Sequence, residues 1–328
     1  MKVGLWGPSQ SGKTTYLAAL SLAADRLPDE AGSLRIQTVE DSPPEDSPPE
    51  DSPPKDSPPK DSPPKDSASR ALVNSREFLL IDNPLQKGTL PEGSFEVTAY
   101  KWMISGSVNE AIAGPRDRTV IQSRPVEFIF EVLDVPGSIF DPRLDPDTKS
   151  LKQMEEYFDS CDGLVYLYDP LGDADDISRI AGYQWNRLAK GRSGFLKHHL
   201  AVCITKFDDS RVFGPAYKEG WLTQETPSSP LLPTDAEAYF NAKAVDLASK
   251  PLRKYFDPSK TRYYATSAVG FSPSMNGQLN HHKIDLDKSP NIRVGKKGFE
   301  LIGPVYPINV LEPLLHLEQS IQAERSAQ

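Results

Sequence analysis

The stretch GPSQSGKTT, residues 7–15, constrains the fold of this chain more than any other, and it follows a short apolar run at residues 3–6. Glycine at positions 7 and 12 allows a tight turn in which successive backbone N–H groups point inward, as a bound phosphate requires. The ammonium of Lys13 would reach the β and γ phosphates, and the hydroxyl of Thr14 would bind Mg²⁺. We therefore predict a nucleotide phosphate site formed by Gly7, Ser9, Gln10, Ser11, Gly12, Lys13, Thr14 and Thr15.

A phosphate-binding loop of this kind needs a strand before it and a helix after it, and the rest of the chain continues that pattern. Apolar runs of strand length alternate with segments of helical spacing, which is typical of a parallel sheet flanked by helices. We predict an α/β fold, a three-layer α/β/α sandwich with a mostly parallel central sheet. The expected strands are 3–6, 95–104, 127–133, 164–168, 200–204 and 262–265, and the expected helices are 14–27 and 310–321.

Residues 41–67 repeat a five-residue unit, DSPPE or DSPPK, that contains no apolar side chain. Such a tract cannot bury a surface, and its proline pairs favour an extended, solvated chain. Six Asp, two Glu and three Lys give it a net charge of −5, out of −9 for all 328 residues. We predict a disordered Pro-rich insertion; the alternative is a docking or phosphorylation tract, since each Ser-Pro pair suits proline-directed phosphorylation.

Length and composition suit one domain over residues 1–328, interrupted by the insertions 41–67 and 272–305. The second insertion, rich in Gly, Pro, Asn and Lys, suits either a solvated hairpin or a partner surface. The acidic balance argues against nucleic-acid partners, and no apolar run is long enough to form an integral membrane segment. Cys161 and Cys203 lie in or beside apolar runs, as buried, reduced thiols of a cytoplasmic protein do.

A carboxylate and a glycine stand at the end of the predicted strand in 128-FIFEVLDVPG-137. Asp134 would be the second, water-mediated partner of magnesium, at the tip of a strand beside the first. Gly137 would let a backbone N–H approach the γ phosphate closely. This Asp134-x-x-Gly137 pattern adds a second element to the phosphate site.

Two motifs at later strand ends suit a guanine base. Thr205-Lys206-x-Asp208 ends the run 200-LAVCITKFDD-209, where Asp208 could accept the N1–H and N2–H of guanine. Adenine lacks this donor pair, and the stem of Lys206 would lie over the ring. A backbone N–H of Ser267-Ala268, after the last predicted strand, could bind the guanine O6.

These motifs, in this order, resemble the nucleotide-binding domain of the Ras-like and translation-factor GTPases of the TRAFAC class. The phrases DVPGS, DGLVYLYDP, TKFDD and INVLEPLLHLE are most similar to the Ras-like domains of bacterial double-GTPase systems. The resemblance implies GTP or GDP and Mg²⁺ as ligands. It assigns catalysis to Lys13, Thr14, Asp134 and Gly137, the metal to Thr14 and Asp134, and base recognition to Thr205, Lys206, Asp208, Ser267 and Ala268.

The sequence departs from that family at three positions. Thr205 stands where many relatives have asparagine, which weakens the case for guanine selectivity. Ser138 stands where Ras-like enzymes have a glutamine that orients the attacking water, so we expect slow unaided hydrolysis; Ser9, in place of glycine, leaves less room for a partner's arginine. The threonine of the first switch is not fixed by the sequence, and the candidates are Thr89, Ser94 and Thr119.

The resemblance predicts a GTP-hydrolysing molecular switch that works with protein effectors or activating factors. The alternative is a nucleotide-binding interaction module with little or no hydrolysis, and an ATPase is disfavoured by Lys206 and Asp208. No metal site is expected at His198-His199 or His281-His282, because neighbouring side chains point apart and no zinc-type spacing surrounds them. The run 173-DADD-176 suits a helix cap better than a calcium loop.

Overall fold

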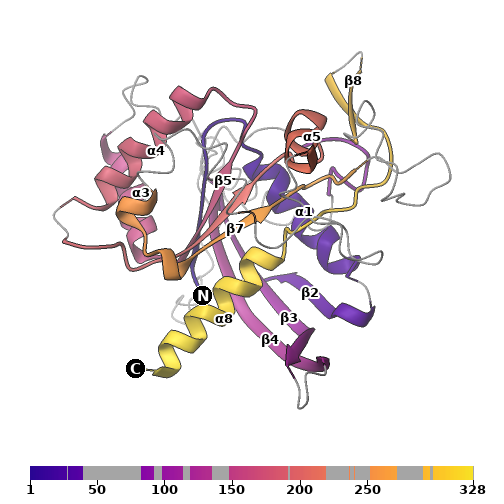
Figure 1. Ribbon diagram of the computed structural model, residues 1–328, viewed down its shortest axis with the longest axis horizontal. Coiled ribbons are helices and arrows are strands. Elements are labelled where there is room, and N and C mark those ends of the chain that lie inside the picture. The colour runs from indigo at the N-terminus through magenta and orange to yellow at the C-terminus, as the bar shows by residue number, and fades with distance from the viewer. Residues whose placement is uncertain are drawn as a thin grey trace, which may run out of the picture.

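The computed structural model shows a layered α/β fold (Figure 1). It describes residues 1–27, 29–39, 83–91, 98–113, 119–134, 148–190, 193–218, 236, 240, 252–271, 291–295 and 298–327. The repeat at 41–67 and most of the insertion at 272–305 lie outside these ranges, so both predictions remain predictions. None of the described helices is long and apolar enough to cross a membrane.

The central sheet has four strands in the order β1-β5-β6-β7, all parallel. Every residue of the first three strands is buried, which is expected when helices cover both faces of a sheet. This parallel sheet and its flanking helices confirm the predicted mixed α/β fold. The strands are β1 (Val3–Trp6), β5 (Gly163–Tyr168), β6 (His199–Ile204) and β7 (Thr261–Ala265).

A second sheet is antiparallel, in the order β2-β3-β4, and consists of β2 (Gly32–Thr38), β3 (Thr98–Ala113) and β4 (Thr119–Asp134). Residues 98–104 and 127–133, which belong to two predicted strands, thus lie in one antiparallel pair, β3 and β4. One parallel bridge, Lys2 to Glu131, joins β4 to the start of β1. The two strands therefore run in the same direction, and β4 ends on the side of the molecule where β1 ends. The sequence did not predict β2, whose side chains alternate between buried and exposed without a strong apolar run.

Helices cover the two faces of the central sheet (Figure 1). One core contains buried side chains of α1 and α8, packed on Val3, Leu5 and the inward residues of β3 and β4. The other contains side chains of α3, α4 and α5, packed around Trp6 and Tyr166. The helices are α1 (Lys13–Asp25), α3 (Thr148–Ser160), α4 (Ala174–Leu188), α5 (Ser210–Lys218) and α8 (Glu312–Ala327).

Local sequence explains where these helices begin. Asp173 caps α4 by accepting a hydrogen bond from Asp176 N–H at 2.9 Å, which confirms the capping role predicted for 173-DADD-176. The last helix begins at Glu312 rather than residue 310, with Pro313 in its first turn, where a missing N–H costs nothing.

Cys161 and Cys203 are buried and free, as predicted.

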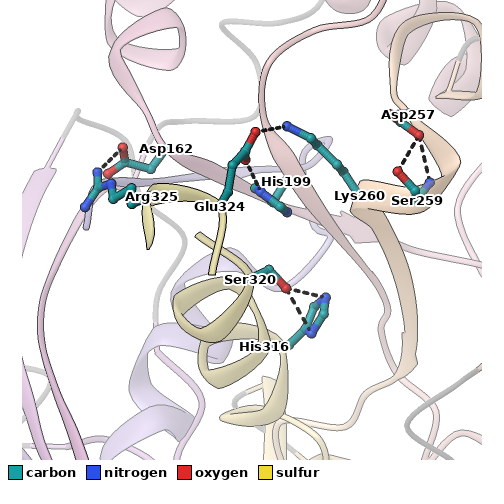
Figure 2. Close-up of polar contacts among 9 residues, drawn as sticks. All are labelled: Asp162, His199, Asp257, Ser259, Lys260, His316, Ser320, Glu324 and Arg325. Atoms are coloured by element: carbon teal, nitrogen blue, oxygen red, sulfur yellow. Dashed lines mark hydrogen bonds and ion pairs between the residues drawn. The ribbon is translucent and has the colours of Figure 1, made fainter. Parts of the chain in front are cut away.

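The last turns of α8 are tied to the amino ends of the parallel strands (Figure 2). Glu324 accepts a hydrogen bond at 2.6 Å from the Nζ of Lys260, the residue just before β7. It also pairs at 2.7 Å with the Nε2 of His199, the first residue of β6. Arg325 pairs with Asp162 at 2.7 Å, just before β5. This polar cluster lies on the edge opposite to the carboxyl ends of the strands, away from the predicted site.

We expect packing, rather than this polar cluster, to hold α8 on the sheet. Leu317 is 0% exposed, so Leu317→Ala should lower the free energy of unfolding by about 2–5 kcal/mol. The Arg325 side chain is 53% exposed, so Arg325→Ala should lower it by less than about 1 kcal/mol. Urea denaturation of both variants measures this, and equal losses would contradict it.

Candidate functional site

The loop between β1 and α1 has the backbone geometry that the sequence predicts. A Cβ at Gly7 would lie 2.4 Å from Ser11 Oγ and 2.9 Å from Leu167 O, so only glycine fits there. Gly12 adopts a φ of +90° and Gln10 a φ of 64°, both in the left-handed region. These angles close the turn tightly and place the loop directly before the first turn of α1.

The start of α1 is suited to an anion. Gly12 caps the helix without a side-chain hydrogen bond, and no acidic residue lies in its first turn. The first turn of α1 therefore offers no negative charge of its own to the positive end of the helix dipole. Lys13 is buried, and its Nζ donates to Gly7 O at 2.8 Å and to Pro8 O at 2.9 Å, which holds its charge against the loop.

The carboxyl ends of the parallel strands meet at the edge where this loop lies (Figure 1). Asp134 is the last residue of β4, and β4 lies beside β1, so its backbone ends on the same side. The side chain of Asp134, like Gly137 and Ser138, lies outside what the structure describes. The position of the second phosphate motif is thus compatible with the prediction, and the roles of Asp134 and Gly137 stay predictions.

The loop after β6 is joined to the end of β5 by three hydrogen bonds. Thr205 donates to Tyr168 O from its N–H at 2.8 Å and from its hydroxyl at 3.1 Å. Lys206 has a φ of 56°, and its Nζ contacts Asp169 Oδ2 at 2.6 Å. The threonine therefore uses its side chain to connect two strand ends, and Asp169 fixes the end of the lysine whose stem was predicted to cover a base.

Asp208 is a buried carboxylate, 4% exposed, that accepts a hydrogen bond from Ser267 Oγ at 2.6 Å. The same hydroxyl accepts from Gly270 N–H at 2.8 Å. Burial raises the pKa of Asp208 from 3.8 to about 6, although the Ser267 hydrogen bond acts in the opposite direction. Burial makes the ionised form of Asp208 costly, so this carboxylate is well suited to accept hydrogen bonds from a ligand near neutral pH.

The loop after β7 separates the roles of the predicted pair Ser267-Ala268. The N–H of Ser267 donates to Ile308 O at 3.1 Å, and its hydroxyl holds Asp208. Ala268 lines a cavity, so it is the member of the pair placed to offer a backbone N–H to a ligand. Sequence reasoning could not separate the two, because the partner Ile308 is far away along the chain.

One cavity of about 570 Å³ brings these loops together. This volume is in the range of sites for drug-sized ligands, about 300–1,000 Å³. Five predicted residues do not line the cavity: Gly7, Ser9, Lys13, Thr14 and Ser267. The side chains of Lys13 and Ser267 instead make hydrogen bonds to neighbouring residues, Gly7 O and Asp208. The predicted residues that line the cavity are Gln10, Ser11, Gly12, Thr15, Thr205, Lys206, Asp208 and Ala268.

Several lining residues were not predicted. Arg211 pairs with Asp209 through two contacts, Nε to Oδ1 at 2.9 Å and Nη2 to Oδ2 at 2.7 Å. Both follow the Thr205–Asp208 motif directly, so a search for charges beyond the motif could have found them. The apolar lining residues include Leu90, Leu171, Val269 and Ile292. Val269 directly follows Ser267-Ala268, whereas no motif marks the segments of Leu90 and Ile292.

The candidates for the first switch are placed differently. Thr89 donates its hydroxyl to Pro84 O at 3.1 Å, and the next residue, Leu90, lines the cavity. Thr119 begins the 16-residue strand β4, at the far end from Asp134, so the structure does not bring it to the site. Ser94 lies outside the described residues. Thr89 therefore stays a prediction.

The described part of the chain contains no group of three or more His, Cys, Asp or Glu that could hold a metal ion. His198 contacts Phe158 O at 2.9 Å, and His199 contacts Glu324, so both adjacent histidines have protein partners. His281 and His282 are not among the described residues.

No protein-family profile and no curated protein matches this chain. Among solved structures it is similar to a chain of the signal recognition particle receptor SRb-GTP/SRX complex from Chaetomium thermophilum, at 13% identity and a TM-score of 0.31, covering 83% of this chain and 92% of that one. It is also similar to the GTPase-like domain of S. cerevisiae Ski7, bound to GTP, at 10% identity and a TM-score of 0.30, covering 86% and 46%.

The raised pKa of Asp208 predicts how stability depends on pH. The pKa lies above that of the unfolded chain, so the linked stability is present below pH 3.8 and is lost as pH rises to about 6. Asp208→Asn avoids this loss, and between about pH 4 and pH 7 the variant should gain up to about 3 kcal/mol over the wild type. Urea denaturation without nucleotide measures the difference, and a difference that does not change with pH would contradict the prediction.

Proposed function

We propose that this chain binds GTP and GDP with Mg²⁺, hydrolyses GTP slowly and acts as a Ras-like molecular switch. The observation that carries the proposal is a cavity lined by residues of the loop after β1, the loop after β6 and the loop after β7. Ligands of open α/β sheets bind at the carboxyl ends of the strands, which is where this cavity lies. The sequence assigns the first loop to phosphates and the other two to a guanine base.

The phosphate end of the site would rest on backbone and positive charge. The uncapped start of α1 and the ammonium of Lys13 supply donors and charge to the β and γ phosphates. Lys13 would exchange its contacts with Gly7 O and Pro8 O for phosphate oxygens. Gly7 and Gly12 keep the loop tight enough for its N–H groups to converge.

The base end would select guanine through Asp208. A carboxylate can accept from both N1–H and N2–H of guanine, whereas adenine presents no such donor pair. Ser267 holds this carboxylate at 2.6 Å, and Asp169 holds the amine of Lys206 at 2.6 Å. Thr205 stands where many Ras-like GTPases have asparagine, and its hydroxyl donates to Tyr168 O. This hydrogen bond holds the loop after β6 against the end of β5.

Thr14 and Asp134 fit a magnesium ion. A hydroxyl and a carboxylate are hard oxygen donors of the kind that magnesium prefers. Thr14 lies in the first turn of α1 and Asp134 is the last residue of β4, and both lie at the same edge of the fold. When bound, magnesium supplies positive charge that stabilises the β and γ phosphate oxygens. The chain's own part is to hold the phosphates on the loop after β1 and to exclude water from the base end.

Hydrolysis by such a site consists of positioning and charge stabilisation, with little covalent work by the protein. The two states of the switch would differ in the segments near Asp134 and Thr89, which a γ phosphate would hold. The phrases noted in the sequence favour a bacterial, double-GTPase-type domain that acts with protein partners. Two buried free thiols fit a reducing, cytoplasmic location.

A second function, a nucleotide-loaded interaction module with little or no turnover, is favoured by Ser138. This residue follows Gly137 where Ras-like enzymes use a glutamine to orient water. Such a module would bind nucleotide through the same loops and signal through its surface.

Nucleotide titration tests the binding proposal. With magnesium present, wild-type protein should bind GDP and GTP in preference to ATP. Lys13→Ala should lose most of this binding, because a charge-assisted phosphate contact is removed. Asp208→Asn should shift preference from guanine toward xanthine, whose O2 can accept from the new amide. Preferential ATP binding, or binding indifferent to both changes, would overturn the assignment.

Single-turnover hydrolysis separates the switch enzyme from the module. Purified protein loaded with GTP should convert it to GDP slowly. Lys13→Ala, loaded at a GTP concentration high enough to fill the site, should be slower by about 100-fold or more, because the ammonium that stabilises the phosphate charge is lost. Arg179→Ala, an exposed substitution on α4, is the control and should leave the rate unchanged. A wild-type rate equal to that of GTP in buffer would favour the interaction module.

A further inference from the structure

The segment that follows the second insertion holds the loop after β7 in place. Ser267 and Ile308 exchange two backbone hydrogen bonds, at 3.1 and 2.8 Å, and Tyr306 N–H donates to Val269 O at 3.1 Å. Gly270 has a φ of +73°, and a Cβ there would lie 2.1 Å from Tyr306 O. The loop that was predicted to contact the base is thus shaped by chain about 40 residues further on.

Asn291 is the polar centre of this contact. It is 0% exposed, and its Nδ2 donates to Pro304 O at 3.0 Å, to Val269 O at 3.2 Å and, more weakly, to Gly303 O at 3.4 Å. Its Oδ1 accepts from Gly303 N–H at 2.9 Å. This one buried side chain therefore connects the loop after β7 to residues 303–304.

The residue after Asn291 continues into the cavity. Ile292 begins β8 (Ile292–Gly295), which pairs with β9 (Gly298–Leu301), and it lines the cavity together with Leu90. A bridge between Thr89 and Glu300 joins this hairpin to the segment that carries Leu90. Two segments far apart in sequence thus supply the apolar wall and are bonded to each other.

We propose that residues 291–295 and 298–308 are an integral part of the guanine site, with Asn291 as its positioning residue and Ile292 as a direct contact of the base or ribose. The inference rests on the proposed function. The hydrogen bond from Asn291 to Val269 O holds the loop so that Ala268 faces the base. Asn291 also positions its neighbour Ile292 at the cavity wall. The described final part of the second insertion then contributes to nucleotide retention.

Loss of the Asn291 side chain would remove one of the two donors to the buried Val269 O, leaving Tyr306 N–H, and would take the Asn291 partner from Pro304 O and Gly303 N–H. Losing these hydrogen bonds weakens the contact between the two segments, so the loop after β7 would open more often. Faster opening of this loop would release nucleotide faster. The association rate, set by access to the cavity, would change less.

The test compares GDP dissociation from the full chain, measured by displacement of a fluorescent GDP analogue, across matched variants. Asn291→Ala is compared with His198→Ala, which also removes a buried side chain bonded to a carbonyl, Phe158 O, at the opposite edge of the sheet. Ile292→Ala is compared with Ile302→Ala, whose side chain is 49% exposed and does not line the cavity. Hydrogen exchange of the peptide 265–271 gives a readout that needs no nucleotide.

We expect Asn291→Ala to raise the GDP dissociation rate by about tenfold and to speed exchange in 265–271, while His198→Ala changes neither at a similar loss of melting temperature. Ile292→Ala should raise the rate by about three- to tenfold, and Ile302→Ala should not. Equal effects of each variant and its control, or an unchanged exchange rate for Asn291→Ala, would overturn the inference. If wild-type protein binds no guanine nucleotide, the proposed function fails first, and the inference fails with it even where exchange shows that Asn291 holds the loop.

Discussion

The site depends on one constraint, the parallel pairing of strands that are buried on both faces. Because β1, β5, β6 and β7 run in one direction, the loops at their carboxyl ends share an edge whatever their separation in sequence. Two apolar cores, one on each face, hold the strands in that order. Residues 10–12 of the loop after β1 and the carboxylate of Asp208 can therefore line the same cavity of about 570 Å³.

Around Asp208, the fold positions polar groups at a cost in stability. Desolvation raises the pKa of Asp208 to about 6, and one hydroxyl, that of Ser267, partly offsets this. Lys206 is likewise fixed by Asp169 at the end of the neighbouring strand. Groups held in this way lose little freedom when a ligand binds, which favours both affinity and selectivity.

Much of the frame could be predicted from sequence because its signals are local. The glycines at 7 and 12, the strands at 3–6, 164–168, 200–204 and 262–265, and the cap at Asp173 each follow from a few adjacent residues. The contacts of Asn291, the pairing of Thr89 with Glu300 and the apolar wall of Leu90 and Ile292 could not, because they join distant segments. The strand β2 escaped prediction because its side chains show no strong apolar pattern.

The central claim is that the loops at the ends of β1, β6 and β7 bind one guanine nucleotide. A crystal structure of the protein, from crystals grown with GDP and Mg²⁺, tests this claim most directly. The account predicts the base against Asp208 and Ala268, the Lys206 stem over the ring, and the diphosphate at the N–H groups of residues 10–15. A nucleotide bound elsewhere, or an empty cavity at saturating GDP, would contradict it.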